Sequence, residues 1–205
     1  MVSIITRTES VIIQDELVLR CVEPRDLAEL YELIYGEDEP EWKRWDAPYY
    51  PLERVSYEHF EQNTFKRLRA DEEEARPASI RVIEADGEIV GLISYYIEDS
   101  LSMWLEIGIV IYKPSRWARG IGTRALQMWS GYLFEQMPIV RVGLTTWSGN
   151  ERMMRAAAKV GFQIEARLRK CRIVLGEYYD SIRMGMLREE WDQMCAIRAD
   201  RNVNN

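Results

Sequence analysis

Apolar positions follow two different periods along this chain, and the changes between them predict its helices and strands. Between residues 24 and 35 apolar side chains return every three or four positions, with Pro24 at the start and Gly36 just beyond the end, which predicts a helix. Between residues 78 and 97 apolar and polar side chains alternate around Asp86-Gly87, which predicts a β-hairpin.

The same patterns extend over the whole chain. Strands are predicted as a pair within 11–22, and over 78–85, 88–97, 101–112, 138–147, 162–174 and 177–187; helices are predicted over 24–35, 56–74, 120–136, 151–160 and from Arg188 onward. An antiparallel meander followed by a strand–helix–strand unit indicates an α/β (α+β) fold, with a mixed sheet and helices on both faces. No linker rich in Pro, Gly or Ser interrupts the chain, so residues 1–205 are expected to form a single domain. Residues 1–15 are expected to add an N-terminal extension strand, and residues 188–205 a C-terminal helix with a frayed tail at its last four residues.

Composition narrows the class of protein. Hydrophobic residues make up 47% of the chain and charged residues 30%, and the net charge is −7. An acidic chain is a poor partner for nucleic acid but is compatible with a cationic substrate. Cys21, Cys171 and Cys195 are too far apart for a CxxC pair, so neither a disulfide framework nor a metal site is expected. This use of cysteine predicts a cytoplasmic location. No signal peptide or stretch of ~20 apolar residues is present, so no membrane association is expected.

One segment, RWARGIGTRAL at 116–126, carries the most specific chemistry. It lies between a predicted strand and a predicted helix, and its glycines allow a tight turn and a close approach of the backbone to a ligand. The N–H groups from Arg119 to Thr123 lie at a helix N-terminus, where they have no helical acceptor and favour an anion. Arg116 and Arg119 are expected to add mobile positive charge. The segment therefore predicts a pyrophosphate site.

The same glycines also satisfy the dinucleotide fingerprint GxGxxG/A. That interpretation, a nicotinamide-dependent oxidoreductase, requires a preceding strand–helix–strand unit and an acidic residue at the end of the next strand. A meander precedes the glycines here, and residues 139–147 contain neither Asp nor Glu, so the fingerprint is disfavoured.

Three segments together resemble the GNAT superfamily of N-acetyltransferases. Residues 105–126 (LEIGIVIYKPSRWARGIGTRAL) resemble its motif A, and residues 150–162 (NERMMRAAAKVGF) resemble motif B. Residues 176–187 (GEYYDSIRMGML) resemble the closing strand of the RimJ/RimL-like branch. The resemblance covers about a quarter of the chain, with the segments in the family's order.

The resemblance implies a mostly antiparallel twisted sheet in which two parallel strands, 101–112 and 138–147, splay apart around acetyl-CoA as cosubstrate, without a metal. The implied activity is transfer of the acetyl group to a primary amine, by direct attack in a ternary complex. The implied acceptors are a protein N-terminus, a polyamine or an aminoglycoside-like amine. The implied cofactor-binding residues are Ile109, Val110 and Ile111 for pantetheine, Arg116, Trp117, Ala118, Arg119, Gly120, Ile121, Gly122 and Thr123 for the pyrophosphate turn, and Asn150 near the pantetheine end.

Glu106 is the candidate base. Alternation places it with Trp104 and Gly108 on one face of its predicted strand, and it matches a catalytic Glu of histone-acetylating relatives. A half-buried carboxylate binds a proton more readily than one in water, which suits a base that works near neutral pH. The other interpretations are a solvated glutamate and a structural partner of an arginine.

The general acid is harder to assign. The family's Tyr and Ser positions in motif B are Ala157 and Met153 here, which leaves a catalytically inactive acetyl-CoA-binding module as the alternative function. Tyr178 is a weak candidate acid. Tyr179, Thr145, Thr146 and Ser148 are further candidates, whereas the single histidine, His59, is expected at the surface.

An acidic, aromatic loop at 37–55 lies where this family builds its acceptor pocket. Its candidate substrate-binding residues are Trp42, Trp45, Asp46, Tyr49 and Tyr50, which would hold a cation by charge and cation–π contact. The alternative is a packed aromatic lid with solvated acids. Exposed sheet edges and the C-terminal helix leave a homodimer open.

Overall fold

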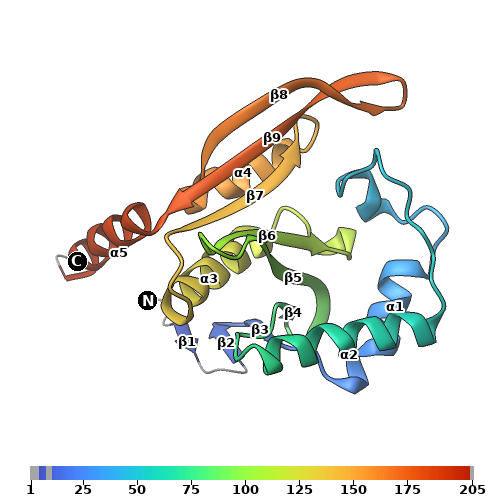
Figure 1. Cartoon of the computed structure of the whole chain (residues 1–205), viewed down its shortest axis with the longest axis horizontal. Helices are drawn as coiled ribbons and strands as arrows, with labels where there is room; N and C mark the ends of the chain where they lie inside the picture. Colours follow the sequence, from blue (N-terminus) through green and yellow to red (C-terminus); the bar gives the residue numbers. More distant parts are fainter. Residues whose placement is uncertain (1–4, 8–10, 204–205) are drawn as a thin grey trace.

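The computed structural model describes the backbone of residues 5–7 and 11–203, and there one mixed sheet forms the centre of the molecule (Figure 1). Its nine described strands are arranged in the order β1-β2-β3-β4-β5-β6-β7-β9-β8. They are β1 (Ile5–Arg7), β2 (Val11–Gln14), β3 (Leu17–Cys21), β4 (Ile80–Ala85), β5 (Glu88–Asp99), β6 (Trp104–Ile111), β7 (Arg141–Trp147), β8 (Gln163–Val174) and β9 (Glu177–Leu187). The helices are α1 (Leu27–Tyr35), α2 (Tyr57–Glu73), α3 (Ile121–Gln136), α4 (Glu151–Val160) and α5 (Arg188–Val203).

The element order confirms the predicted mixed fold, and the differences lie at element ends. β6 begins at Trp104 rather than at residue 101, because the Asp99 carboxylate accepts hydrogen bonds from the Ser102 backbone N–H (2.7 Å) and hydroxyl (2.8 Å) and closes a turn. Short 3₁₀ turns precede α1, interrupt the loop 37–55 at Glu41–Arg44, and precede the glycine turn.

The two chain ends extend the predicted elements. β1 pairs antiparallel with β2 at the edge of the sheet, which places two strands in the predicted N-terminal extension. At the other end α5 continues through Val203, two residues into the predicted frayed tail. Residues 1–4, 8–10 and 204–205 lie outside the described part.

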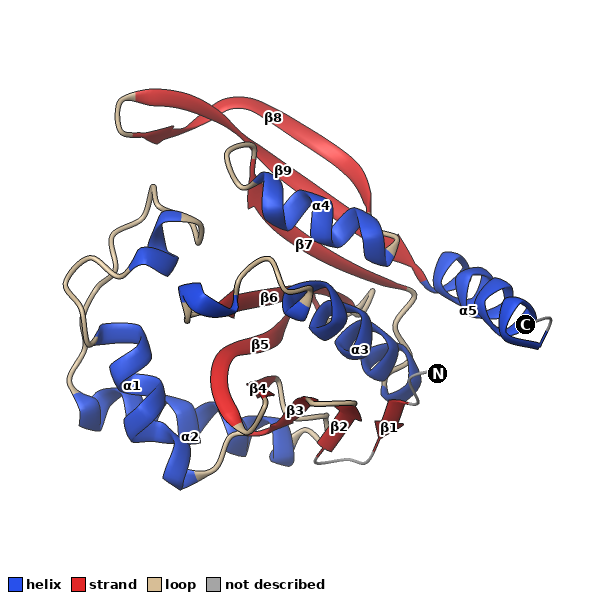
Figure 2. Ribbon diagram, turned by 180° about the vertical axis from the view of Figure 1, so that it is seen from behind, coloured by secondary structure: helices blue, strands red, loops and turns tan. Residues whose placement is uncertain are grey.

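Helices cover both faces of the sheet (Figure 2). On one face Leu27 and Leu30 of α1 form a cluster with Val82 and Ile89, and Phe65 and Leu68 of α2 pack against it. On the other face α3 and α4 bury their apolar sides in the main core, where Trp129 of α3 is fully buried. Among the helices of the described residues, none has the length and apolar character that a membrane-spanning segment needs.

The sheet divides where β6 meets β7. These two strands run parallel and pair only at Leu105–Val142 and Glu106–Gly143, after which they separate. β7 continues instead along β9, from Arg141–Leu187 to Trp147–Ser181. The predicted splayed parallel pair is therefore confirmed, and beyond Glu106 the side of β6 toward β7 has no strand partner among the described residues.

Candidate active site

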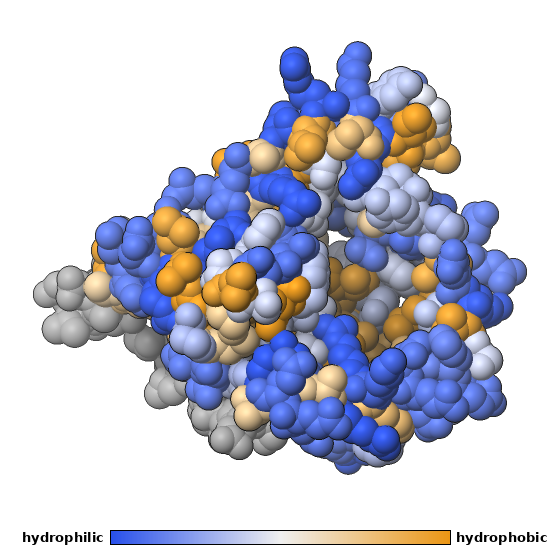
Figure 3. Space-filling model, in the orientation of Figure 1, coloured by the Kyte–Doolittle hydropathy of each residue, from blue (hydrophilic) through white to orange (hydrophobic). Residues whose placement is uncertain are grey.

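A cavity of about 580 Å³ lies where β6 and β7 separate. The start of α3, one side of α4 and the loop 37–55 complete its walls. The space-filling view shows a hollow in the surface of the molecule (Figure 3). The predicted cofactor-binding residues that line it are Ile109, Val110, Ile111, Arg116, Trp117, Ala118, Gly120, Ile121, Gly122, Thr123 and Asn150. Arg119 is exposed and is not part of the lining.

The glycine turn adopts the conformation that an anion site requires. Gly120 precedes α3 with a left-handed backbone (φ +79°), a conformation that side chains disfavour, and a Cβ placed there would meet nothing within 4 Å. The backbone N–H groups of Ile121, Gly122 and Thr123 in the first turn have no acceptor within the helix. Trp117 supports the turn, since its indole N–H donates to the carbonyl of Ile111 (2.8 Å). These observations fit a pyrophosphate held by backbone donors.

The structure corrects the expectation that Arg116 is a mobile charge. Its guanidinium contacts Asp86 and Glu88, each at 2.7 Å, and these hydrogen bonds raise the pKa of Arg116. Two carboxylates thus hold Arg116 in place at the cavity wall and balance its charge.

Glu106 lies at the last residue pair that joins β6 to β7, and it is only 1% exposed. Its carboxylate accepts hydrogen bonds from the Thr145 hydroxyl (2.7 Å), the Tyr96 hydroxyl (3.2 Å) and the Arg183 guanidinium (3.0 Å). The interpretation as a solvated glutamate is therefore wrong, and the interpretation as an arginine partner holds. Glu106 is not part of the cavity lining, whereas Thr145 is.

Tyr96 and Arg183 were missed by the sequence analysis. The signal for Tyr96 was present in the predicted hairpin, because β5 and β6 pair Tyr96 directly with Glu106. Arg183 reaches Glu106 from β9, a neighbour that no local pattern indicates. Burial and the charge of Glu106 raise the pKa of Tyr96 to about 12, so its phenol keeps its proton at neutral pH.

The loop 37–55 is fixed to the far side of the cavity through its backbone. The carbonyl of Trp45 accepts hydrogen bonds from the Trp147 indole (3.0 Å) and from the Asn150 side-chain amide (2.9 Å). The side-chain oxygen of Asn150 accepts from the Met153 backbone N–H (3.1 Å) and caps α4. Asn150 therefore connects the helix start to the loop.

Arginines of the chain itself contact the aromatic rings of this loop. Arg152 of α4 lies 4.5 Å from the Trp45 ring and 5.4 Å from the Trp117 ring. Arg172 of β8 lies 4.6 Å from the ring of Tyr49. These cation–π contacts join the loop to α4 and to the β8–β9 hairpin.

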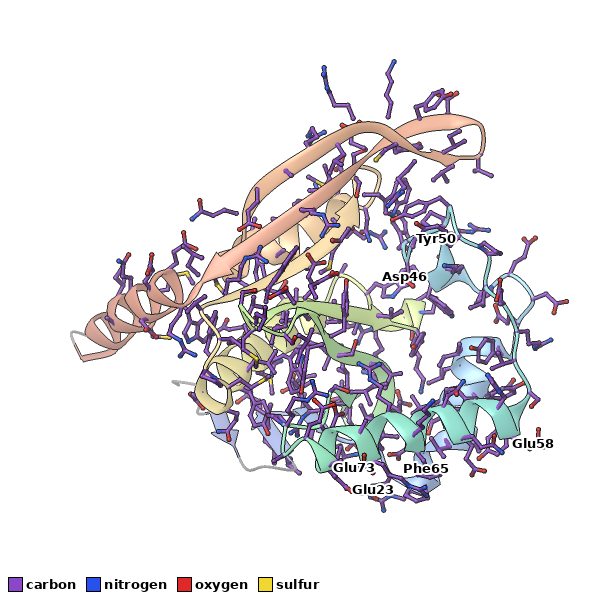
Figure 4. The ribbon with its side chains drawn as sticks, in the orientation of Figure 1. Glu23, Asp46, Tyr50, Glu58, Phe65 and Glu73 are labelled. Carbon is purple, nitrogen blue, oxygen red and sulfur yellow. The ribbon has the colours of Figure 1, made fainter. Side chains whose placement is uncertain are left out.

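The other predicted substrate-binding residues of the loop 37–55 differ in their surroundings. Trp42 is buried and packs edge-on against Tyr112, with ring centres 5.2 Å apart. Asp46 lies below Tyr50 in Figure 4, nearer to the sheet, and lines the cavity. Removal from water raises the pKa of Asp46, and the nearby charge of Lys43 partly opposes this shift. Tyr50 is 57% exposed and does not line the cavity.

The weak acid candidate Tyr178 is separated from the cavity. It is 61% exposed on the outer hairpin and is not part of the lining. Tyr179 packs its ring against Trp147, and the Ser148 hydroxyl accepts from the Asp180 backbone N–H. His59 is exposed, as expected, and no cluster of three metal-ligand side chains occurs among the described residues.

Known proteins resemble this chain over most of its length. The family model described as an acetyltransferase (GNAT) domain matches residues 16–163. The SPbeta prophage-derived uncharacterized N-acetyltransferase YokL of Bacillus subtilis is 26% identical, over 87% of this chain and 93% of its own. The putative ribosomal N-acetyltransferase YdaF of the same species is 27% identical, over 88% of this chain and 96% of its own. The crystal structure of spermidine N-acetyltransferase from Vibrio cholerae, in complex with CoA and spermine, has a TM-score of 0.70 at 19% identity, over 86% of this chain and 98% of that chain.

Proposed function

The chain belongs to the GNAT acetyltransferase family, and on this premise we propose that it acetylates a primary amine in a ternary complex, as a RimJ/RimL-like member whose preferred acceptor is a peptide N-terminus. It is an acetyltransferase that uses acetyl-CoA. The bound cosubstrate supplies the activated acetyl group, and the residues of the chain orient it, exclude water and accept a proton.

The observation that carries the cosubstrate assignment is the splayed strand pair that ends at the left-handed Gly120. Ile109 offers its backbone N–H and carbonyl, and Ile111 its N–H, on the side of β6 without a strand partner, which suits an amide-containing arm. The first turn of α3 offers its N–H groups to the pyrophosphate. Among the cavity residues, Arg152, Arg155 and Lys159 add positive charge suited to phosphates.

The charge around the cavity supports a peptide N-terminus over a polyamine. Asp46 is the acidic residue among those that line the cavity; it keeps an exposed surface, and partial loss of water raises its pKa, which weakens it as a partner for a cation. Glu106 is paired with Arg183, whose side chain is 43% exposed. A polyamine carries several positive charges and needs unpaired carboxylates, whereas one α-amine needs a single proton acceptor.

We assign the base role to Glu106 within this proposal. A Glu106→Gln variant keeps the size of the side chain but removes its basicity, so kcat/KM should fall by about 10²–10⁴-fold. Acetyl-CoA binding, measured by calorimetry, should stay within threefold of wild type. Equal turnover in the two proteins would contradict the assignment.

The acceptor is tested by CoA release, followed with a thiol reagent. Acetyl-CoA is offered with peptides that carry free N-termini, with the same peptides N-terminally blocked, with spermidine, and with an aminoglycoside. Turnover with free but not blocked peptides is expected, and faster turnover with spermidine would overturn the acceptor choice. Thermal stabilisation by CoA without turnover would favour the inactive binding module, and stabilisation by NADH alone would favour the oxidoreductase.

Homodimer formation is a further part of the proposal. β8 is one of the two edge strands of the described sheet, and its exposed apolar side chains include Ile164, Leu168 and Ile173. Such an edge is often covered by a partner. Light scattering on the purified protein should give twice the 24.2 kDa mass of one chain.

A further inference from the structure

We propose that the Thr145 hydroxyl carries the proton between the acceptor amine in the cavity and the buried carboxylate of Glu106. This inference rests on the proposed function and adds the route of the proton to it. In this route Thr145 contacts the reacting amine, and Glu106 acts through it.

The positions of the two residues require an intermediary. Glu106 is 1% exposed and lies outside the cavity lining, so an amine in the cavity has no direct path to its carboxylate. Thr145 lines the cavity and donates its hydroxyl to Glu106 Oε2 at 2.7 Å, the shortest of the three hydrogen bonds to this carboxylate. A short hydrogen bond to an ionised acceptor is the geometry of a proton transfer step.

The backbone explains why these side chains meet. Glu106 pairs with Gly143 across the parallel contact, and Thr145 follows two residues later on the same face of β7. Gly143 has no side chain, and a Cβ there would lie 3.3 Å from the Glu106 side chain and 3.0 Å from the Arg141 guanidinium. The glycine thus leaves room for the carboxylate to reach the hydroxyl of the next residue on that face.

The other two donors are less suited to this route. A guanidinium donates hydrogen bonds but has no acceptor atom, so Arg183 cannot take up the amine proton and pass it on. The hydroxyl of Tyr96 lies 3.2 Å from the same oxygen, and this residue is not part of the cavity lining. The charged groups nearest to Glu106 are Arg183, which contacts its carboxylate at 3.0 Å, and Arg141, whose guanidinium lies beside Gly143.

The step balances without a co-reactant. As the neutral amine nitrogen forms its bond to the acetyl carbon, its N–H proton passes to Thr145 Oγ1, and the original hydroxyl proton passes to Glu106 Oε2. The Thr145 hydroxyl is unchanged in this exchange. Glu106 then holds one proton, which the same hydroxyl returns to the departing sulfur as the carbon–sulfur bond breaks, so the residues end as they began.

Two single-hydroxyl variants provide the test, since each removes one donor to the same Oε2. Thr145→Val should lower kcat by about 10²-fold or more. Tyr96→Phe should change kcat by less than about fivefold, and Thr145→Ser should restore most of the rate lost in Thr145→Val. Acetyl-CoA affinity, measured by calorimetry, should stay within threefold in all three variants.

A double variant separates a shared route from two independent effects. Thr145→Val combined with Glu106→Gln should be no slower than the slower single variant, because both changes interrupt one route. A double variant that shows the product of both losses would overturn the proposal, as would a Thr145→Val protein with the wild-type kcat.

An infrared measurement keeps the test informative if no acceptor in the panel reacts. The carboxylate band of Glu106, obtained as the difference between wild type and Glu106→Gln, should shift in Thr145→Val and stay in place in Thr145→Ser. An unshifted band would show that the hydrogen bond is not made, and would overturn the relay whatever becomes of the proposed acetylation.

Discussion

The two halves of the active-site cavity are built in different ways. The half that we propose binds the cofactor, called the cofactor half, is made mainly from one continuous segment, β6 through the glycine turn into α3, and its main groups are backbone donors and acceptors. The half that we propose binds the acceptor, called the acceptor half, is made from groups far apart in the chain: the Trp45 carbonyl accepts hydrogen bonds from the side chains of Trp147 and Asn150, and Arg172 contacts the ring of Tyr49. The first half therefore depends on backbone geometry, whereas single side-chain substitutions would alter the second half.

The largest expected effect tests the cofactor half. Gly120→Ala places a side chain in a left-handed conformation, which costs about 1–2 kcal/mol, so CoA affinity should fall about tenfold if the turn must keep its shape. Gly87→Ala is the matched control, because Gly87 has a similar φ of +76° and an equally open surrounding. Calorimetry should show weaker CoA binding only in Gly120→Ala, and equal losses would show that the turn does not act locally.

The next effect concerns Asn150, which belongs to both halves. Asn150→Ala removes the cap of α4 and the hydrogen bond to Trp45, and should lower the free energy of unfolding by about 1 kcal/mol. Asn150→Asp retains a capping oxygen but loses the donor, so the loss should be about half as large. Urea unfolding of the two variants would measure the hydrogen bond from the Asn150 amide to the Trp45 carbonyl. Equal losses in both variants would mean that this hydrogen bond contributes nothing to stability.

A third prediction concerns how the stability of the folded protein changes with pH, through a buried tyrosine beneath the loop 37–55. Burial raises the pKa of Tyr112, which packs on Trp42 under the lid. A phenol with a raised pKa stabilises the folded state fully below the unfolded value of about 10, and this contribution is lost as the pH rises further. Urea unfolding should therefore show stability falling above pH 10. Tyr112→Phe should flatten that fall, whereas Tyr178→Phe, on the exposed hairpin, should leave it unchanged.

The smallest effect is expected at Arg116. Because Asp86 and Glu88 already balance its charge, Arg116→Ala should change CoA affinity by less than threefold. Arg119→Ala should weaken CoA binding more, since this exposed arginine adjoins the turn, and its effect should shrink as salt rises. Calorimetry at two salt concentrations checks both, and a larger loss in Arg116→Ala would show that its carboxylate partners release it.

These differences also explain how much the sequence could predict. The cofactor half follows from local rules: alternation gives β6, the glycines give the turn, and helical periodicity gives α3. The contacts of Glu106 with Arg183 and Thr145 depend on which strands become neighbours, and the order β6-β7-β9 appears in no local pattern. For the same reason the arginines that meet the aromatic loop were missed, since Arg152 and Arg172 read locally as an exposed helix residue and an exposed strand residue.

The short pairing between β6 and β7 divides the sheet into two parts that few backbone hydrogen bonds connect. Strands β1 to β6 form one hydrogen-bonded ladder and β7 to β9 another, with two residue pairs joining them. Regions joined by so few backbone hydrogen bonds open as cooperative units, each with its own free energy. Amide hydrogens of β7 to β9 should therefore exchange together, at a rate different from that of β3 to β5, and a ligand that bridges the two ladders should slow exchange in both.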